Sequence, residues 1–149
     1  MIVTQPDAFE IGALPDVLTR YTPGLVVTNG QPNLSPAYTA LQNAWSDLPI
    51  MTAQAGQHFE FSDGAALTIL HPETTPTLTD RLNDGVLTLR LSYGSASFLI
   101  TSDLSGAAQE QIVEAGLLQP TTVLILPQHG AAGALDDAFL DAASPQIVL

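Results

Sequence analysis

The chain has 149 residues, enough for one domain with a layered core, and 46% of them are hydrophobic, which excludes a disordered chain. The chain has fifteen acidic and three basic residues. Its net charge of −12 repels a phosphate backbone, so direct nucleic-acid binding is not expected. The absence of cysteine excludes disulfides and thiolate metal sites. No apolar run reaches the roughly 20 residues of a membrane span.

The first half of the chain predicts a strand, a loop, a helix and a second strand, the order of an α/β domain. The strands cover residues 1–4 and 25–28, and the helix covers 16–21 after Pro15. A second helix is expected to begin at Ser35-Pro36, because serine is a good cap and proline suits the first turn. Tyr38, Leu41 and Trp45 fall on one face of that helix and predict core contacts.

The second half predicts two hairpins followed by alternating helices and strands. Two hairpins favour a mixed or antiparallel sheet over an all-parallel one. The chain is therefore predicted to be an α/β domain with mixed sheets flanked by helices. In chain order we expect strands at 58–61 and 66–70, a surface loop at 73–84, strands at 86–92 and 96–101, a helix at 105–115, a strand at 122–126, a helix at 136–143 and a strand at 146–149.

Two of these strands end in residues that carry chemistry. Asp103 follows the apolar strand 97–101, and His129 follows the apolar strand 122–126. Adjacent strand ends that deliver a carboxylate and an imidazole into loops are a common way to build a pocket on a rigid sheet. Residues 3–14, Val-Thr-Gln-Pro-Asp-Ala-Phe-Glu-Ile-Gly-Ala-Leu, form a third segment of this kind.

Together, the three segments resemble the metallo-β-lactamase-like domain of the ComEC-type DNA-internalisation (competence) proteins. The resemblance implies part of a four-layer αββα sandwich, formed by residues 1–149 as a single domain that is truncated at both ends. Open sheet edges and apolar surface left by a missing half-sheet would favour a protein partner or self-association. The resemblance also implies a bacterial, soluble domain, for which a place in the extracytoplasmic part of a membrane protein is open.

Matched residue by residue, the resemblance keeps the frame of a metal site but few of its ligands. Asp7, Asp103 and His129 stand at ligand positions of the family, and Glu10 replaces a histidine. Ala13 and Ser102 replace glycines. Three further ligand positions hold residues that ligate poorly or not at all, namely Gln5, Phe9 and Gln128.

The sequence therefore predicts a degenerate, non-catalytic domain related to bacterial DNA uptake, without a cofactor. The alternative is a weak hydrolase, phosphodiesterase- or nuclease-like, in which Asp7, Glu10, Asp103 and His129 hold a single zinc, manganese or magnesium ion. Asp103 and His129 are its candidate catalytic residues.

Purely structural roles are open for the same side chains. Asp7 and Asp103 could cap helices and His129 could be a loop residue, while His58 and His71 are weaker ligand candidates. A flavodoxin-like or receiver-like domain is a third reading, disfavoured because no glycine-rich phosphate loop and no lysine are present.

Overall fold

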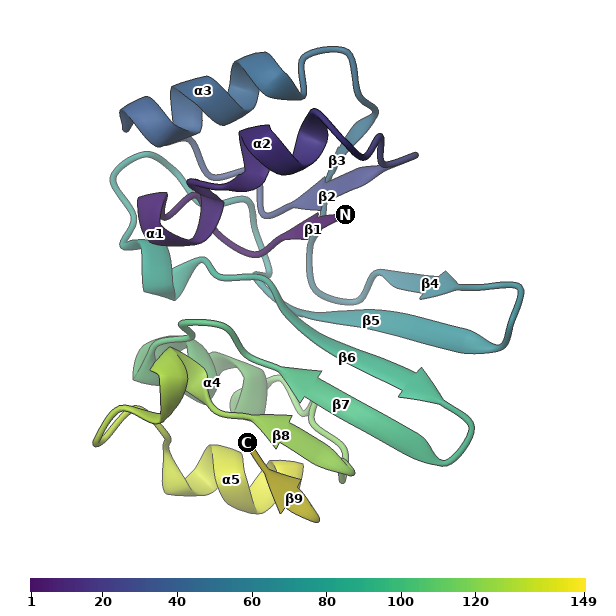
Figure 1. The fold of residues 1–149 in the computed structure, drawn as a ribbon. Coiled ribbons are helices and arrows are strands. Elements are labelled where there is room, and N and C mark those ends of the chain that lie inside the picture. The colour runs from purple at the N-terminus through teal and green to yellow at the C-terminus, as the bar shows by residue number, and fades with distance from the viewer.

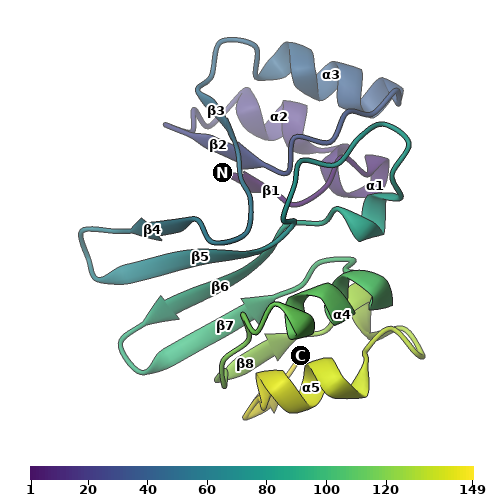
Figure 2. The ribbon, with the colours of Figure 1, turned by 180° about the vertical axis from the view of Figure 1, so that it is seen from behind.

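The computed structural model describes all residues from 1 to 149 and arranges them in four layers, with two sheets between two groups of helices (Figures 1 and 2). Sheet A has the strand order β1-β2-β3, and sheet B the order β4-β5-β6-β7-β8-β9. The strands are β1 (Ile2–Val3), β2 (Val26–Thr28), β3 (Ile50–Thr52), β4 (His58–Glu60), β5 (Ala65–His71), β6 (Thr88–Tyr93), β7 (Ala96–Ile100), β8 (Val123–Ile125) and β9 (Ile147–Val148).

Helices cover the outer face of each sheet. In Figure 1, α2 and α3 lie above sheet A, and the view from behind in Figure 2 shows α4 and α5 in front of sheet B. The helices are α1 (Ala8–Ile11), α2 (Leu14–Leu18), α3 (Pro36–Ala44), α4 (Gly106–Glu114) and α5 (Asp137–Ala143), with short 3-10 turns η1 (Leu82–Asp84) and η2 (Pro127–Gly130). The predicted αββα arrangement is confirmed.

The mixed pairing of sheet B is also confirmed. Strands β4 to β7 pair antiparallel through two hairpins, and β8 and β9 then add in parallel. Sheet A is entirely parallel. Because β7 and β8 are adjacent and parallel, their carboxyl ends lie at the same edge of the sheet.

Three apolar clusters fill the spaces between the four layers. The first joins α1 and α3 to sheet A through Ile11, Leu41 and Trp45 together with Val3 and Val26. The second lies between the sheets, around Val27, Ala53, Leu67, Ile69, Leu87 and Leu89. The third joins sheet B to α4 and α5, and its members are Leu70, Leu99, Leu104, Ala108, Ile112, Leu124, Phe139 and Ala143.

The aromatic stripe on α3 packs as predicted. Trp45 is buried and Tyr38 packs against the same cluster, with the two rings edge to face at 6.4 Å between centroids. Burial raises the pKa of the Tyr38 hydroxyl above its usual range. This stripe is core packing.

Several elements differ from the sequence-based expectation. The sequence did not predict α1 or β3, which are four and three residues long and too short to show a period. The helix predicted over residues 16–21 runs from Leu14 to Leu18, because Pro15 fits inside its first turn and its end is capped at Thr19. No helix has the length and apolar character needed to cross a membrane.

The cap of α4 is Ser105 and not Asp103. The Ser105 hydroxyl accepts a hydrogen bond from the Ala108 amide at 3.2 Å, which satisfies an otherwise unpaired donor of the first turn. Asp103 is therefore not used as a helix cap and is left for other contacts.

Replacing Ser105 with alanine is expected to lower the free energy of unfolding by about 1 kcal/mol, because the first turn of α4 loses its acceptor. Urea denaturation followed by circular dichroism measures the change. Ser95→Ala is the matched control, since Ser95 is exposed in the β6–β7 turn, and an equal loss in both variants would contradict the assignment.

Candidate functional site

Three loops carry the residues that the sequence singled out. The first follows β1 and contains Gln5 and Asp7, and it leads into α1, which contains Glu10. The second follows β7 and contains Asp103, and the third follows β8 and contains His129. Hydrogen bonds between side chains connect the first loop to the second. We call the carboxylates, amides, hydroxyls and imidazole of these loops the strand-end cluster; its members are Thr4, Gln5, Glu10, Ser102, Asp103, Gln128 and His129.

The backbone at the ends of β7 and β8 is left-handed at three residues that are not glycine. The φ angles of Ser102, Gln128 and His129 are 48°, 49° and 55°. Such values are uncommon outside glycine and asparagine and cost free energy. The main-chain N–H of Gln128 donates to the Ser102 carbonyl at 3.0 Å, so the two loops are joined by their main chains.

Gln5 is the buried member of the cluster that contacts Asp103. Its side chain is 1% exposed, and its amide nitrogen donates to Oδ2 of Asp103 at 3.0 Å. The amide oxygen is buried and has no hydrogen-bond partner. A hydrogen bond from an amide to a carboxylate is charge-assisted, so Gln5 holds Asp103 as a donor.

Asp103 meets the imidazole with its other oxygen. Nε2 of His129 lies 3.8 Å from Oδ1 of Asp103, and the His129 side chain is 90% exposed. A pair this open to water is screened and contributes little to stability. The two predicted catalytic candidates are thus brought together, with the imidazole facing solvent.

Glu10 is held by hydroxyl groups. Ser102 donates to Oε1 and Thr4 donates to Oε2 of its carboxylate, both at 3.1 Å. The Thr4 and Ser102 hydroxyls also lie 3.0 Å apart. These contacts tie the loop after β1 in sheet A to the end of β7 in sheet B.

Asp7 and Phe9 lie outside the contacts of the strand-end cluster. Oδ1 of Asp7 accepts from the Phe9 amide at 2.8 Å and caps α1, which confirms the structural interpretation of this carboxylate. The Phe9 side chain is 99% exposed. No three histidine, cysteine or acidic side chains gather closely enough to form a metal-binding group.

Gln128 is half-buried and binds a main-chain carbonyl. Its amide nitrogen donates to the Leu104 carbonyl at 3.3 Å. It also lines a cavity of about 360 Å³ together with Asn83, Asp84 and Ser105. The cluster therefore borders an open space through Gln128.

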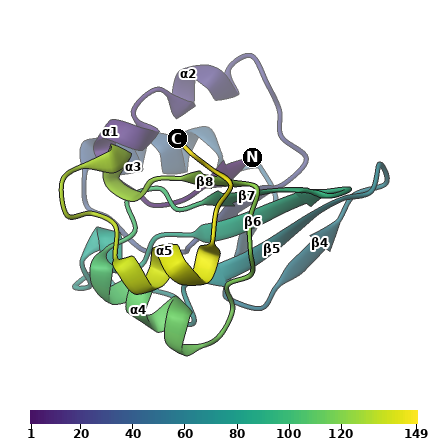
Figure 3. The same ribbon diagram turned by 90° about the horizontal axis from the view of Figure 1, so that it is seen from below.

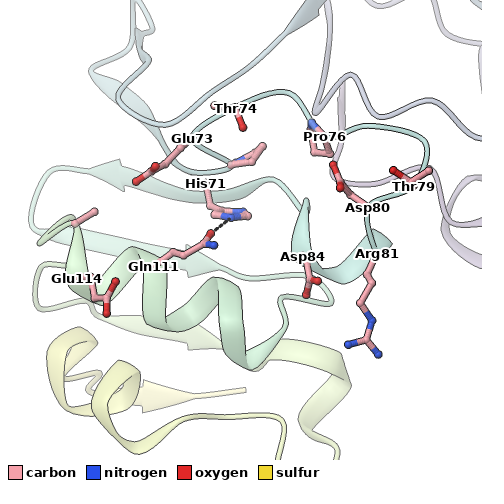
Figure 4. A pocket seen from close by; sticks show the side chains of 12 residues that line it. His71, Glu73, Thr74, Pro76, Thr79, Asp80, Arg81, Asp84, Gln111 and Glu114 are labelled. Atoms are coloured by element: carbon pink, nitrogen blue, oxygen red, sulfur yellow. Dashed lines mark hydrogen bonds between the residues drawn. The ribbon is translucent and has the colours of Figure 1, made fainter.

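A larger cavity, of about 690 Å³, lies between the loop after β5 and the side of α4, and sequence analysis did not find it (Figure 4). Four carboxylates, one guanidinium and the buried His71 line it. The acidic and basic members are Glu73, Asp80, Asp84, Glu114 and Arg81. The one available signal was the density of acids in residues 73–84, which is equally typical of a solvated loop.

His71 is a structural residue of this cavity wall. Nδ1 lies 2.9 Å from the Val86 carbonyl and Nε2 lies 3.3 Å from Oε1 of Gln111. A backbone carbonyl can only accept, so Nδ1 carries a proton. His58 lies instead on the exposed edge strand β4, beside Thr68 and Glu60.

Replacing Gln5 with glutamate is expected to destabilise the fold at neutral pH by about 1–3 kcal/mol, because a second carboxylate would face Asp103 in a buried position. Repulsion raises the pKa of the pair above that in the unfolded chain, so the loss should shrink as the pH falls and one proton is shared. Urea denaturation between pH 4 and 8 measures this. Gln42→Glu on exposed α3 makes the same charge change and should show no such pH dependence; equal profiles would contradict the contact.

Comparison with known proteins supports the fold. No protein-family model and no curated protein matches the sequence. Among solved structures, a mutant of CmlA beta-hydroxylase superposes with a TM-score of 0.60 at 12% identity, covering 99% of this chain and 35% of that chain. CmlA, a diiron beta-hydroxylase from Streptomyces venezuelae, gives a TM-score of 0.55 at 12% identity, with 99% and 34% covered.

These neighbours have the metallo-β-lactamase fold, and this chain has it as well. The chain spans about a third of the length of the proteins it superposes on. The similarity concerns the arrangement of sheets and helices.

Proposed function

We propose that this chain is a non-catalytic domain of metallo-β-lactamase fold that serves a bacterial DNA-uptake system as a scaffold. The observation that carries the proposal is the role of Gln5, whose amide donates to Asp103 at the position where the resemblance expects a histidine ligand. Phe9 and Gln128 support it, because one side chain extends into solvent and the other binds a carbonyl. The strand-end cluster thus joins the two sheets.

The side chains of the cluster do not fit a pair of metal ions. A dinuclear site needs several imidazoles and carboxylates that converge on ions about 3.5–4 Å apart. This cluster offers one exposed imidazole, and hydroxyl or amide protons already occupy both oxygens of Glu10 and one oxygen of Asp103. The diiron chemistry named for CmlA is therefore not proposed here.

The link to DNA uptake rests on the three motif segments. The net charge of −12 argues that the chain would serve such a system through protein contacts and not by holding DNA itself. An extracytoplasmic position as part of a membrane protein fits this proposal.

The alternative is a single-ion hydrolase, favoured by the approach of His129 to Asp103 at 3.8 Å. In this alternative Asp7, Glu10, Asp103 and His129 would hold one divalent ion such as zinc, manganese or magnesium, which would supply an activated water. His129 would accept a proton at the solvent-facing side.

Metal titration separates the two proposals. A metal ion that binds only the folded state must raise the melting temperature. Because the scaffold proposal expects no ion to bind, zinc, manganese and magnesium at neutral pH should leave the melting temperature of the purified chain unchanged. Differential scanning fluorimetry measures this, with Asp103→Ala and His129→Ala as matched variants. Saturable stabilisation that both variants lose, together with phosphodiesterase activity lost in Asp103→Ala, would replace the scaffold proposal with the hydrolase.

A further inference from the structure

The loop between β5 and β6 forms one wall of the cavity of about 690 Å³, and buried polar side chains hold this loop in place. Gln31 is 1% exposed, and its amide nitrogen donates to the carbonyls of Thr77 and Asp80 at 3.2 and 3.0 Å. Asn29 is also buried and donates to the Gly85 carbonyl at 2.8 Å. The wall is therefore formed before a ligand binds, as in most binding pockets of about 300–1,000 Å³.

Helix α4 forms the opposite wall. Seen from below in Figure 3, α4 lies beside the teal segment that follows β5, and the main-chain N–H of Ser105 at its start donates to the Asn83 carbonyl at 3.0 Å. Gln111 and Glu114 are the polar residues of this helix that line the cavity. The cavity thus lies between two segments that are fixed to each other.

The buried His71 ring presents an acceptor to the cavity that no donor of the chain satisfies. Nδ1 carries a proton, because it lies 2.9 Å from the Val86 carbonyl. In the neutral ring Nε2 is then an acceptor, and Oε1 of Gln111, which faces it at 3.3 Å, is an acceptor as well (Figure 4). His71 is 2% exposed, and a buried acceptor without a donor costs free energy. A ligand N–H in the cavity would supply the missing donor.

Carboxylates flank this pair of acceptors. In Figure 4, Glu73 and Glu114 lie to one side of His71, and Asp80 and Asp84 lie to the other. None of the four carboxylates takes part in an ion pair. One oxygen of Asp80 accepts from a main-chain N–H, whereas the other three carboxylates accept no hydrogen bond from the chain. The wall is therefore negative on both sides of the ring, which favours a ligand with a positive charge at each end.

The side chains of this wall suit an organic cation better than a metal ion. A metal ion needs several ligands that converge on one point, and no three histidine, cysteine or acidic side chains lie that close together. Arg81 lines the cavity, but its side chain extends away from His71 in Figure 4 and forms no ion pair with the carboxylates. Carboxylates on either side of a central acceptor instead match amino groups that are spread along a chain.

We propose that this cavity binds a linear aliphatic polyamine. The terminal ammonium groups bind the carboxylates on the two sides, and an N–H group between them donates to Nε2 of His71 or to Oε1 of Gln111. Ammonium groups donate hydrogen bonds and accept none, so they complement a wall on which unpaired acceptors predominate. The site is separate from the strand-end cluster, and the inference holds whether or not that cluster binds a metal ion.

The test is isothermal titration calorimetry with spermidine as the probe, on the full chain at pH 8 and about 0.15 M salt, where the Debye length is about 8 Å. We expect saturable binding of one spermidine per chain. Glu73→Gln combined with Glu114→Gln should lower the affinity by about tenfold or more, because the charge-assisted hydrogen bonds are lost. Glu60→Gln combined with Glu110→Gln is the matched control: it makes the same change in net charge at exposed positions outside the cavity, and it should lower the affinity by less than about threefold.

Heteronuclear NMR of the His71 ring gives an independent readout. Without spermidine we expect a proton on Nδ1 alone, and spermidine should shift the Nε2 resonance as that nitrogen accepts a hydrogen bond. Circular dichroism melting verifies that each variant is folded. The proposal is overturned if spermidine does not bind, if both pairs of substitutions weaken binding equally, or if both ring nitrogens already carry protons. It is also overturned if magnesium displaces spermidine at equal concentration, because general attraction to an acidic surface would then explain the binding.

Discussion

A variant with Gln5→His, Phe9→Asp, Glu10→His and Gln128→His is expected to bind zinc and to be stabilised by it. Together with Asp7, Asp103 and His129 the new side chains supply the imidazoles and carboxylates that zinc prefers. At a free zinc concentration about 100 times the dissociation constant, the gain in the free energy of unfolding should be about 2.7 kcal/mol. Thermal melting with and without zinc, and zinc content after dialysis, measure the gain.

The matched control carries the same four substitutions and Asp103→Ala. It should lose most of the zinc-dependent stabilisation, because Asp103 lies between the loop after β1 and the loop after β8. A folded variant that gains no more from zinc than the wild-type chain would show that these loops do not present the four positions toward one point.

Replacing Phe139 with alanine is expected to lower the free energy of unfolding by about 3–5 kcal/mol. Phe139 is fully buried in the cluster that joins α4 and α5 to sheet B, and its removal leaves a cavity among Leu99, Leu124 and Ile112. Urea denaturation monitored by circular dichroism measures the loss.

A second phenylalanine provides the comparison. Phe9 is 99% exposed, so Phe9→Ala should change the free energy of unfolding by less than about 0.5 kcal/mol. If the two variants were equally destabilised, the assignment of Phe139 to the core and of Phe9 to the solvent would be wrong.

Helices and strands could be predicted from the sequence where their own residues show a cap, a turn or an apolar pattern. The β6–β7 hairpin, the helix capped by Ser105 and the helix capped by Asp136 lie where composition and turn residues place them. Very short elements such as β3 could not be predicted, because three residues carry no period and their strand conformation depends on pairing with β2.

The candidate site was predictable in position but not in its contacts. The order of strands indicated that Asp103 and His129 would lie at neighbouring strand ends, and the parallel pairing of β7 and β8 explains why they do. The donor role of Gln5 depends on 98 residues of separation along the chain, which no local pattern can report. The cavity beside His71 was missed for the same reason, because its walls come from a loop and a distant helix.

The left-handed residues Ser102, Gln128 and His129 have a consequence for how this chain can change over generations. Their conformation is maintained in part by a hydrogen bond between main-chain atoms, from Gln128 to Ser102, which does not depend on the identity of either side chain. The main chain thus keeps these two loops together whichever side chains they display, but the left-handed conformation restricts the residues that can replace the present ones. Glycine and asparagine are tolerated most easily there, whereas valine, isoleucine and threonine would be strained.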